Sequence, residues 1–183
     1  MYQGASEIEK KNWDYQRYEP SKIDFIIITH THIDHCGLLP LMVRHGFTGK
    51  IYATPPTVDS LEIMLADSAH IQEVEALWKS RKNLRRGGKA IATLYNETDA
   101  KQVMPFLVKI PYETPFEPHA GIKMVFRDAG HILGSAFVEM FVDENGKKQR
   151  LFFRRHWKAA AVHYQRPRRY CFGRLPYHGI NLW

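Results

Sequence analysis

Side chains that could bind a metal ion stand close together near the start of the chain. His30, His32, Asp34 and His35 fall within six residues, directly after an apolar run at residues 23–29. Imidazole nitrogens and carboxylate oxygens are the ligands of zinc and similar divalent ions. Alternate residues of an extended segment project to the same side, so His30 and His32 can share one ion, and Asp34 and His35 then face a second. The spacing predicts a two-metal centre.

Such a centre is suited to hydrolysis. Two ions about 3.5–4 Å apart can hold one hydroxide at neutral pH and stabilise both the entering and the leaving oxygen of a displacement. A lone histidine after a strand would more often be an ordinary polar loop residue, but a run of four ligands is far more specific for a metal site. The residues therefore predict a metal-dependent hydrolase.

Strands and helices are expected to alternate around this cluster. Residues 23–29 are β-branched and apolar, which is typical of a buried strand, so the ligands stand at its carboxyl end. Apolar residues at helical spacing predict a helix at 37–45 that ends at Gly46, and a second helical stretch at 58–82, as one long helix or two. A short strand is expected at 50–53.

The later part of the chain favours strands. A capped short helix is expected at 98–106, followed by a loop at 111–118. Alternating apolar and polar residues, with a turn between the last two segments, predict strands at 121–129, 136–142 and 147–153. Strands and helices together indicate an α/β sandwich.

Residues 30–40 resemble the motif of a known family. His-x-His-x-Asp-His followed by Gly-Leu-Leu-Pro is similar to the metal-binding motif of the metallo-β-lactamase superfamily. Segments 67–73, 94–100 and 128–136 resemble the RNA-processing β-CASP branch of that superfamily. The similarity covers about residues 2–153, and it implies an αββα sandwich and an RNA-cleaving hydrolase.

The resemblance assigns roles to five residues. It implies that His30, His32 and His131 hold one zinc ion and that Asp34 and His35 hold the other. It also implies that Asp34 is catalytic, taking a proton from the attacking water. His131 lies between two expected strands, where a loop at the sheet edge can reach the metals, and glycines on both sides of it would let the backbone approach closely.

Both ends of the chain depart from the family pattern. The family's first strands should precede Met1, and its metal-bridging Ser-Gly-Asp should follow the last expected strand, where Phe153 leads into Arg154 instead. One allowed spelling of residues 153–157, TTC-AGG-CGA-CAT-TGG, encodes Ser-Gly-Asp-Ile-Gly when read one base later. We therefore expect a partial domain at 1–153 and an out-of-frame, poorly ordered tail at 154–183.

This hypothesis makes the sandwich incomplete. It would lack the first strands, the bridging-Asp segment and the β-CASP cap, and an unpaired sheet edge would be prone to aggregation. Weak or no activity is expected of such a chain. A coding DNA that cannot spell the shifted motif would refute the frameshift.

The composition limits what the net charge implies. The formal charge of +7 is matched by seven basic side chains and no acid within 154–183. The basic excess is therefore no evidence for a folded RNA-binding surface. Two cysteines are too few for a disulfide framework, and no apolar run is long enough to span a membrane. We expect a cytoplasmic protein that does not enter the membrane.

Other polar residues have simpler explanations. His70 is expected to take part in helix packing or capping, and Cys36 in core packing, rather than in metal binding. Lys82, Arg85 and Arg86 could contact a phosphate backbone, but a solvated helix end is the simpler explanation.

The leading functional hypothesis is an RNA phosphodiesterase that uses two zinc ions to cleave single-stranded RNA, as an exonuclease, an endonuclease or both. A second hypothesis is another hydrolase of the same fold, acting on a thioester, lactone or lactam. A third is a non-catalytic product that binds metal poorly or binds RNA through its basic tail. RNA binding that is strongly salt-dependent and disappears without residues 154–183 would favour the third.

Overall fold

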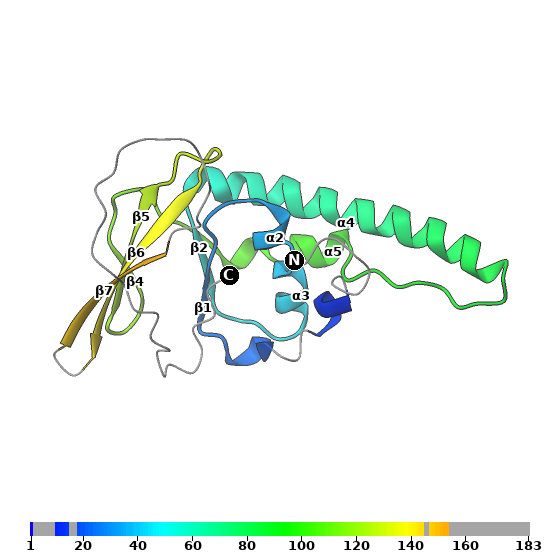
Figure 1. Ribbon diagram of the computed structural model, residues 1–183, viewed down its shortest axis with the longest axis horizontal. Helices are drawn as coiled ribbons and strands as arrows, with labels where there is room; N and C mark the ends of the chain where they lie inside the picture. The colour runs from blue at the N-terminus through cyan, green and yellow to red at the C-terminus, as the bar shows by residue number, and fades with distance from the viewer. Residues whose placement is uncertain (2–9, 15–17, 145–146, 154–183) are drawn as a thin grey trace.

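Two β-sheets packed face to face form the centre of the structure, and helices cover one of them (Figure 1). The computed structural model describes residues 1, 10–14, 18–144 and 147–153. The three-stranded sheet contains β1 (Phe25–Ile27), β2 (Lys50–Ala53) and β3 (Leu107–Lys109). The four-stranded sheet contains β4 (Phe116–His119), β5 (Ile122–Asp128), β6 (Ala136–Glu144) and β7 (Lys147–Phe153). The α-helices are α2 (Ile33–Cys36), α3 (Leu39–Arg44), α4 (Pro55–Leu84) and α5 (Glu97–Lys101), and short 3-10 turns are η1 (Lys10–Trp13), η3 (Pro20–Lys22) and η4 (Met104–Phe106).

Strand β1 contributes to two hydrophobic cores, one on each face of the parallel three-stranded sheet. Ile26 packs among side chains of the helices, whereas Phe25 and Ile27 pack against the second sheet. Successive side chains of a strand point to opposite faces, and all three residues are buried. A strand buried on both faces needs an uninterrupted apolar run, which confirms the strand expected within residues 23–29.

The four-stranded sheet is antiparallel and buries one face against β1. Ile122, Met124 and Phe126 alternate along β5 and lie in the core between the sheets. Helices α3, α4 and α5 all lie on the other side of the three-stranded sheet (Figure 1). The described residues thus supply a helical layer and both sheet layers of an αββα sandwich, and no helix among them covers the outer face of the second sheet.

Helix α4 is one continuous helix that extends far beyond the sheets (Figure 1). Pro55 and Pro56 occupy its first turn, where missing backbone N–H groups cost no intrahelical bond. Leu61 and Leu65, four residues apart, are fully buried, but the equally apolar Leu77 is 60% exposed because this half of the helix projects from the domain. No helix among the described residues, α4 included, is long and apolar enough to cross a membrane.

The shorter elements confirm several expectations. Strand β2 occupies residues 50–53, and α3 is followed by Gly46 in a left-handed conformation with a φ of 98°. Strands β5, β6 and β7 form the expected meander, although the turn at 145–146 lies outside the described residues.

The helix expected at 98–106 was wrong in both its cap and its length. Asn96 is the N-cap, and it exchanges reciprocal hydrogen bonds with Asp99 at 2.9 and 3.1 Å. Helix α5 ends at Lys101, and a separate 3-10 turn follows around Pro105, whose ring nitrogen cannot donate to a helix.

The loop expected at 111–118 was also partly wrong, because β4 includes Phe116 and Pro118. Proline is tolerated there since β4 is an edge strand. Strand β3 was not foreseen, because its three residues are too few to show an alternation of apolar and polar side chains.

Candidate metal centre

The cluster of candidate metal ligands begins at His30, three residues after the end of β1, and continues into α2. The backbone is extended through His32, which is the N-cap residue of α2, and becomes helical at Ile33. The Thr29 carbonyl accepts a hydrogen bond from the Ala136 N–H at 2.8 Å, which joins this segment to the start of β6. The site therefore lies where the carboxyl end of β1 meets the second sheet.

Three of the five proposed ligands form one compact group. His30, His32 and His131 each offer a ring nitrogen, and these nitrogens lie within 4.8 Å of one another. The rings are nearly perpendicular in pairs, with interplanar angles of 76° to 80° and centroids 4.8 to 5.2 Å apart. Three mutually perpendicular imidazoles can direct their nitrogens at one point between them.

The nitrogen positions fit a zinc ion. His131 Nε2 and His32 Nδ1 are 3.3 Å apart. Two nitrogens bound to a tetrahedral zinc at 2.0–2.1 Å would be separated by about 3.3 Å. Thr29 Oγ1 lies 2.9 Å from His30 Nδ1, and a hydroxyl on one ring nitrogen fixes an imidazole for metal binding through the other. The metal-binding atom of His30 would then be its buried Nε2.

Asp34 and His35 form a second pair beside the three histidines. His35 Nε2 lies 3.4 Å from Asp34 Oδ2, a spacing that also suits two ligands of one ion. The His35 ring lies 4.3 Å from the His30 ring, centroid to centroid. The structure thus brings three of the five predicted residues into one group, with the His35 ring against the His30 ring and Asp34 beside His35.

A short loop between β5 and β6 carries His131 and is held by several hydrogen bonds. Ser135 Oγ accepts the backbone N–H groups of His131 and Ile132 at 3.1 and 3.0 Å. The Gly134 carbonyl accepts hydroxyl groups of Thr54 and Thr57, at 2.5 and 2.8 Å. These bonds anchor the loop to the start of α4 and so position His131.

The two glycines that flank His131 differ in their surroundings. Both have a positive φ, 61° for Gly130 and 80° for Gly134. A Cβ on Gly134 would lie 2.6 Å from the Thr57 nitrogen, whereas a Cβ on Gly130 would meet no atom within 4 Å. The expected close approach occurs only at Gly134, and there the neighbour is α4 rather than the metal-binding side chains. At Gly130 the expectation was wrong, since only the backbone conformation favours glycine.

We expect Gly134→Ala to lower both the stability of the protein and its affinity for zinc. A left-handed conformation costs alanine about 1–2 kcal/mol, and the contact with Thr57 adds to this by moving the loop. Urea unfolding and zinc titration measure the two effects. Gly130→Ala is the matched control, because it imposes similar strain in open space. Equal losses of zinc affinity in both variants would show that the contact with Thr57 does not position His131.

Cys36 and His70 lie outside the group of three histidines. Cys36 is fully buried and donates to the Thr31 carbonyl at 3.3 Å, and burial raises the pKa of its thiol to about 12. Because Cys36 is fully buried and lies outside the group of possible metal ligands, it is a packing residue. The expected packing or capping role of His70 was wrong: the side chain is exposed on α4, and its Nδ1 lies 3.2 Å from Glu97 Oε1.

Some positioning residues were missed at the level of sequence. Thr54, Thr57 and Ser135 are buried and hold the His131 loop, and the Tyr112 hydroxyl donates to the Ser135 carbonyl at 2.9 Å. Thr54 is recognisable from sequence as a helix cap ahead of two prolines, but nothing local shows that it bonds to a loop 80 residues later.

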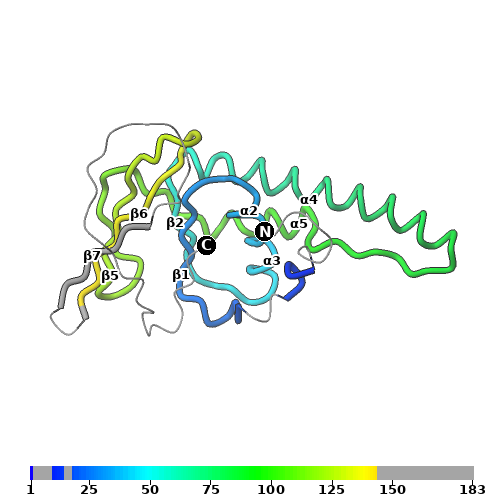
Figure 2. The backbone as a smooth tube through the Cα atoms, in the orientation of Figure 1, coloured from blue at the N-terminus to red at the C-terminus, as the bar shows by residue number. Residues whose placement is uncertain are grey.

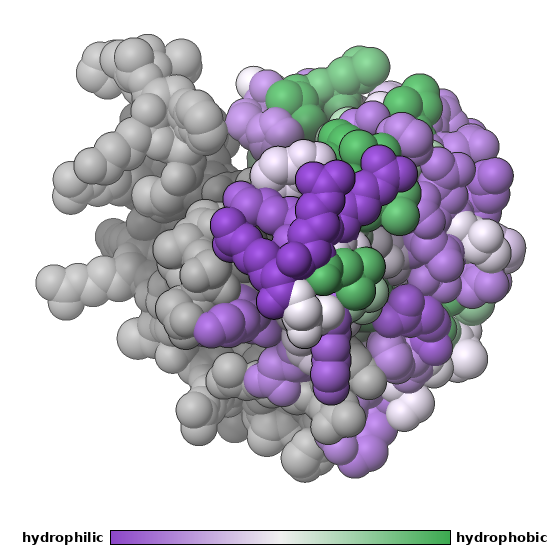
Figure 3. Space-filling view, turned by 90° about the vertical axis from the view of Figure 1, so that its right-hand side faces the viewer, coloured by the Kyte–Doolittle hydropathy of each residue, from purple (hydrophilic) through white to green (hydrophobic). Residues whose placement is uncertain are grey.

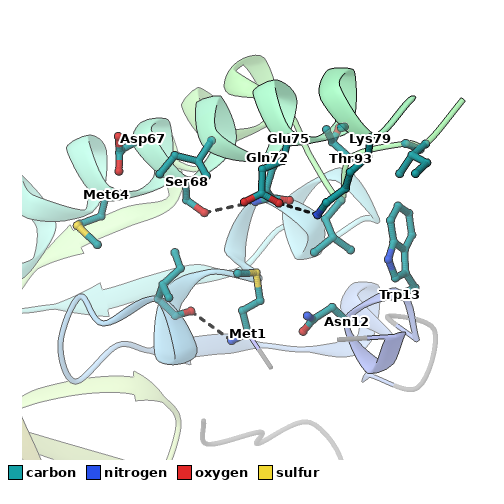
Figure 4. Close-up of a pocket in the computed structure, with 16 residues that line it drawn as sticks. Met1, Asn12, Trp13, Met64, Asp67, Ser68, Gln72, Glu75, Lys79 and Thr93 are labelled. Carbon is teal, nitrogen blue, oxygen red and sulfur yellow. Dashed lines mark hydrogen bonds and ion pairs between the residues drawn. The ribbon is translucent and has the colours of Figure 1, made fainter. Parts of the chain in front are cut away.

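A cavity among the described residues is separate from the three histidines. It has a volume of about 510 Å³ and lies between α4, residues 91–94 and η1 (Figure 4). Ser68 and Gln72 point into it from α4, opposite Met1 (Figure 4). Ser68 Oγ lies 2.9 Å from the buried Tyr95 hydroxyl, so the segment at 67–73 connects the helix to the core here.

Comparison with known proteins agrees with the fold. Residues 4–136 match the metallo-beta-lactamase superfamily. This match covers most of the chain, which therefore belongs to the metallo-β-lactamase superfamily. Membership of this superfamily implies a fold that can bind metal.

Curated relatives act on RNA or transcription according to their names. The chain is 35% identical over 121 residues to transcription termination factor FttA of Pyrococcus horikoshii, covering 66% of this chain and 16% of that protein. It is 30% identical over 133 residues to FttA of Methanococcus maripaludis, covering 73% and 19%. It is 29% identical over 138 residues to ribonuclease TTHA0252 of Thermus thermophilus, covering 75% and 27%. The chain spans about a fifth of the length of these relatives. Their names are consistent with membership of the chain in the RNA-processing β-CASP branch.

Among solved structures, the chain is similar to the Rm3 metallo-beta-lactamase, with a TM-score of 0.46 and 14% identity over 82% of this chain and 49% of that one. A second similar structure is MEM-A1, a subclass B3 metallo-beta-lactamase from a soil metagenome library, with a TM-score of 0.46 and 13% identity over 79% and 47%.

Proposed function

We propose that this chain carries the metal-binding part of a zinc-dependent RNA phosphodiesterase. The observation that carries the proposal is the group of His30, His32 and His131 at the junction of the two sheets. This group is built from segments 99 residues apart and has nitrogen spacing suited to zinc. Relatives named as a ribonuclease and as a transcription termination factor support RNA as the substrate class.

The five ligands divide between two ions in this proposal. His30, His32 and His131 would hold one zinc, and Asp34 with His35 would contribute to a second. Zinc bound here would supply a hydroxide at neutral pH and an electrophile for phosphate oxygens. Asp34 is 38% exposed, so its carboxylate can accept a proton from a water at the surface of the site.

Other hydrolytic substrates remain the second candidate. Thioesters, lactones and lactams are alternatives on the same scaffold, because a fold alone does not determine a substrate. RNA is favoured by segments 67–73 and 128–136, which resemble the β-CASP branch, and by the names of the relatives. The third candidate is a product without activity that binds RNA or metal.

The organisation of the chain is also a proposal. We propose residues 1–153 as a partial metallo-β-lactamase domain of a cytoplasmic protein whose partner is single-stranded RNA. The proposed out-of-frame tail at 154–183 lies outside the described residues. Sequencing of the coding DNA across codons 145–183 tests it, and a frame that cannot encode Ser-Gly-Asp after Phe152 would refute it.

The test of function is an RNA cleavage assay. We expect zinc-loaded chain to cleave end-labelled single-stranded RNA slowly, and Asp34→Asn to lower the rate by about 100-fold or more through loss of the proton acceptor. Gel electrophoresis of the products over time measures both rates. Asp67→Asn is the matched control, since Asp67 lies on α4 at the separate cavity.

Two results would contradict this function. Hydrolysis of a thioester, lactone or lactam without RNA cleavage would support the second candidate. RNA binding that does not depend on zinc, with no cleavage by the unchanged chain or by Asp34→Asn, would support the third candidate.

A further inference from the structure

The projecting end of α4 and the segment that follows it are strongly basic. We call residues 78–91 the basic arm. Its basic residues are Lys79, Arg81, Lys82, Arg85, Arg86 and Lys89, and it contains no acidic residue. All six are exposed. Unlike the tail at 154–183, these charges have described positions in the fold.

Side-chain hydrogen bonds hold the arm in a defined shape. After α4 ends, the chain turns and runs back along the helix (Figure 2). Ser80 Oγ accepts the Ile91 N–H at 2.8 Å, and Asn83 Nδ2 donates to the Lys89 carbonyl at 2.7 Å. A Cβ on Gly88 would lie 2.5–2.7 Å from the Asn83 amide group, so a side chain at this position would displace that amide. The charges are therefore displayed on a built structure rather than on a frayed helix end.

Little within the chain neutralises these charges. Lys79 pairs with Glu75 at 2.7 Å, one turn earlier on α4. Among the described residues, no ion pair involves Arg81, Arg85 or Arg86. The next acidic residue after Glu75 is Glu97, beyond the arm. Several positive charges close together repel one another, so an anionic partner would stabilise this arrangement.

An aromatic side chain is displayed among the charges. Trp78 is 63% exposed, and Lys82 Nζ lies 5.3 Å from its ring centroid. Leu77 and Leu84 are also more than half exposed. The view onto this end of the molecule shows strongly hydrophilic side chains gathered around scattered hydrophobic ones (Figure 3). An exposed indole beside several cations resembles the combination by which proteins hold single strands, with bases stacked on aromatic rings and phosphates near Arg and Lys.

We propose that the basic arm is a binding site for single-stranded RNA, with phosphates contacting Arg81, Arg85 and Arg86 and a base stacking on Trp78. RNA fits this surface better than a protein partner does, because six cations with no acidic residue among them match a phosphate backbone. At 1.5 Å per residue, the helical part of the arm lies about 32–40 Å along α4 from Thr57, which adjoins the His131 loop. The arm would therefore add affinity for long strands and take no part in bond cleavage.

Binding without metal tests this proposal independently of the proposed activity. The probe is a fluorescein-labelled oligouridylate, followed by fluorescence anisotropy with the full chain in a chelating buffer. We expect the triple variant Arg81→Ala, Arg85→Ala, Arg86→Ala to reduce the slope of log K against log salt by about 2, at about 0.7 per lost phosphate contact. Lys50→Ala, Lys101→Ala, Lys123→Ala removes as many exposed charges elsewhere and should leave the slope nearly unchanged.

The aromatic contact has a separate readout. Trp78→Ala should weaken binding at least about five-fold, and Trp78→Phe, which keeps an aromatic face, should restore most of it. Equal effects of the two triple variants would overturn the proposal, since attraction would then depend on total charge alone. It would also be overturned if Trp78→Ala dissociated a dimer in sedimentation and left RNA binding intact, because the surface would then bind a second copy of the chain.

Discussion

We expect His131→Ala to bind zinc more than about 100-fold more weakly than the unchanged chain. His131 is one of three imidazoles whose nitrogens lie within 4.8 Å, and the loss of a residue that merely orients a ligand already weakens metal binding 10- to 100-fold. His131 is half-buried on a surface loop, so alanine leaves the two cores unchanged. Competition with a chromophoric chelator measures the affinity, and atomic absorption measures the zinc retained after gel filtration.

The control for this experiment is a histidine of the four-stranded sheet, whose β5–β6 loop carries His131. His119 lies exposed on β4, with Nδ1 3.2 Å from the Ala120 carbonyl. His119→Ala should retain the zinc affinity of the unchanged chain. Circular dichroism should show both variants folded. If His131→Ala bound zinc as tightly as His119→Ala, the grouping of the three histidines would not be a metal site, and the proposed RNA phosphodiesterase would lose its main support.

We expect Arg127→Met to destabilise the protein by about 3 kcal/mol, because it removes the cation that faces a buried carboxylate. Glu139 is 1% exposed, and its Oε2 accepts from Arg127 Nε at 2.9 Å and lies 2.8 Å from Nη2. Arg127 also pairs with Glu113 at the surface. The measurement is urea unfolding at neutral pH, followed by circular dichroism.

An exposed ion pair provides the comparison. Lys109 Nζ lies 2.6 Å from Asp59 Oδ1, and both side chains are more than half exposed. Lys109→Met should therefore lower the free energy of unfolding by less than about 1 kcal/mol. Adding Glu139→Met to Arg127→Met should recover most of the lost stability, because it removes the unbalanced charge. Similar losses in Arg127→Met and Lys109→Met would mean that water reaches Glu139 freely and that its burial does not strengthen the pair.

Much of the architecture could be predicted from local pattern. The apolar run at 23–29 predicted a buried strand, because a strand packed on both faces has no polar positions. Gly46 predicted the end of α3, because the left-handed conformation there excludes most other residues. Strand β3 and the true cap of α5 were missed, since short elements depend on neighbours that are distant in sequence.

In α4, the helical spacing of apolar residues predicts the helix but not which of these residues are buried. Leu61, Leu65 and Leu77 recur at helical spacing and predict a single buried face. The structure buries the first two and exposes the third, because the domain beneath the helix ends before the helix does. The same projection creates the basic arm, which the sequence alone explained as an ordinary solvated helix end.

The sequence by itself identified the candidate metal ligands, because ligand chemistry is a property of side-chain type. His30, His32, Asp34 and His35 are adjacent in the chain, so their proximity follows from covalent connection and local backbone shape. Only the tertiary structure brings His131 to 3.3 Å from His32, across 99 residues. The proximity of His131 and His32 depends on the packing of the two sheets and on hydrogen bonds from the start of α4 to the Gly134 carbonyl. Neither can be predicted from the spacing of residues along the chain.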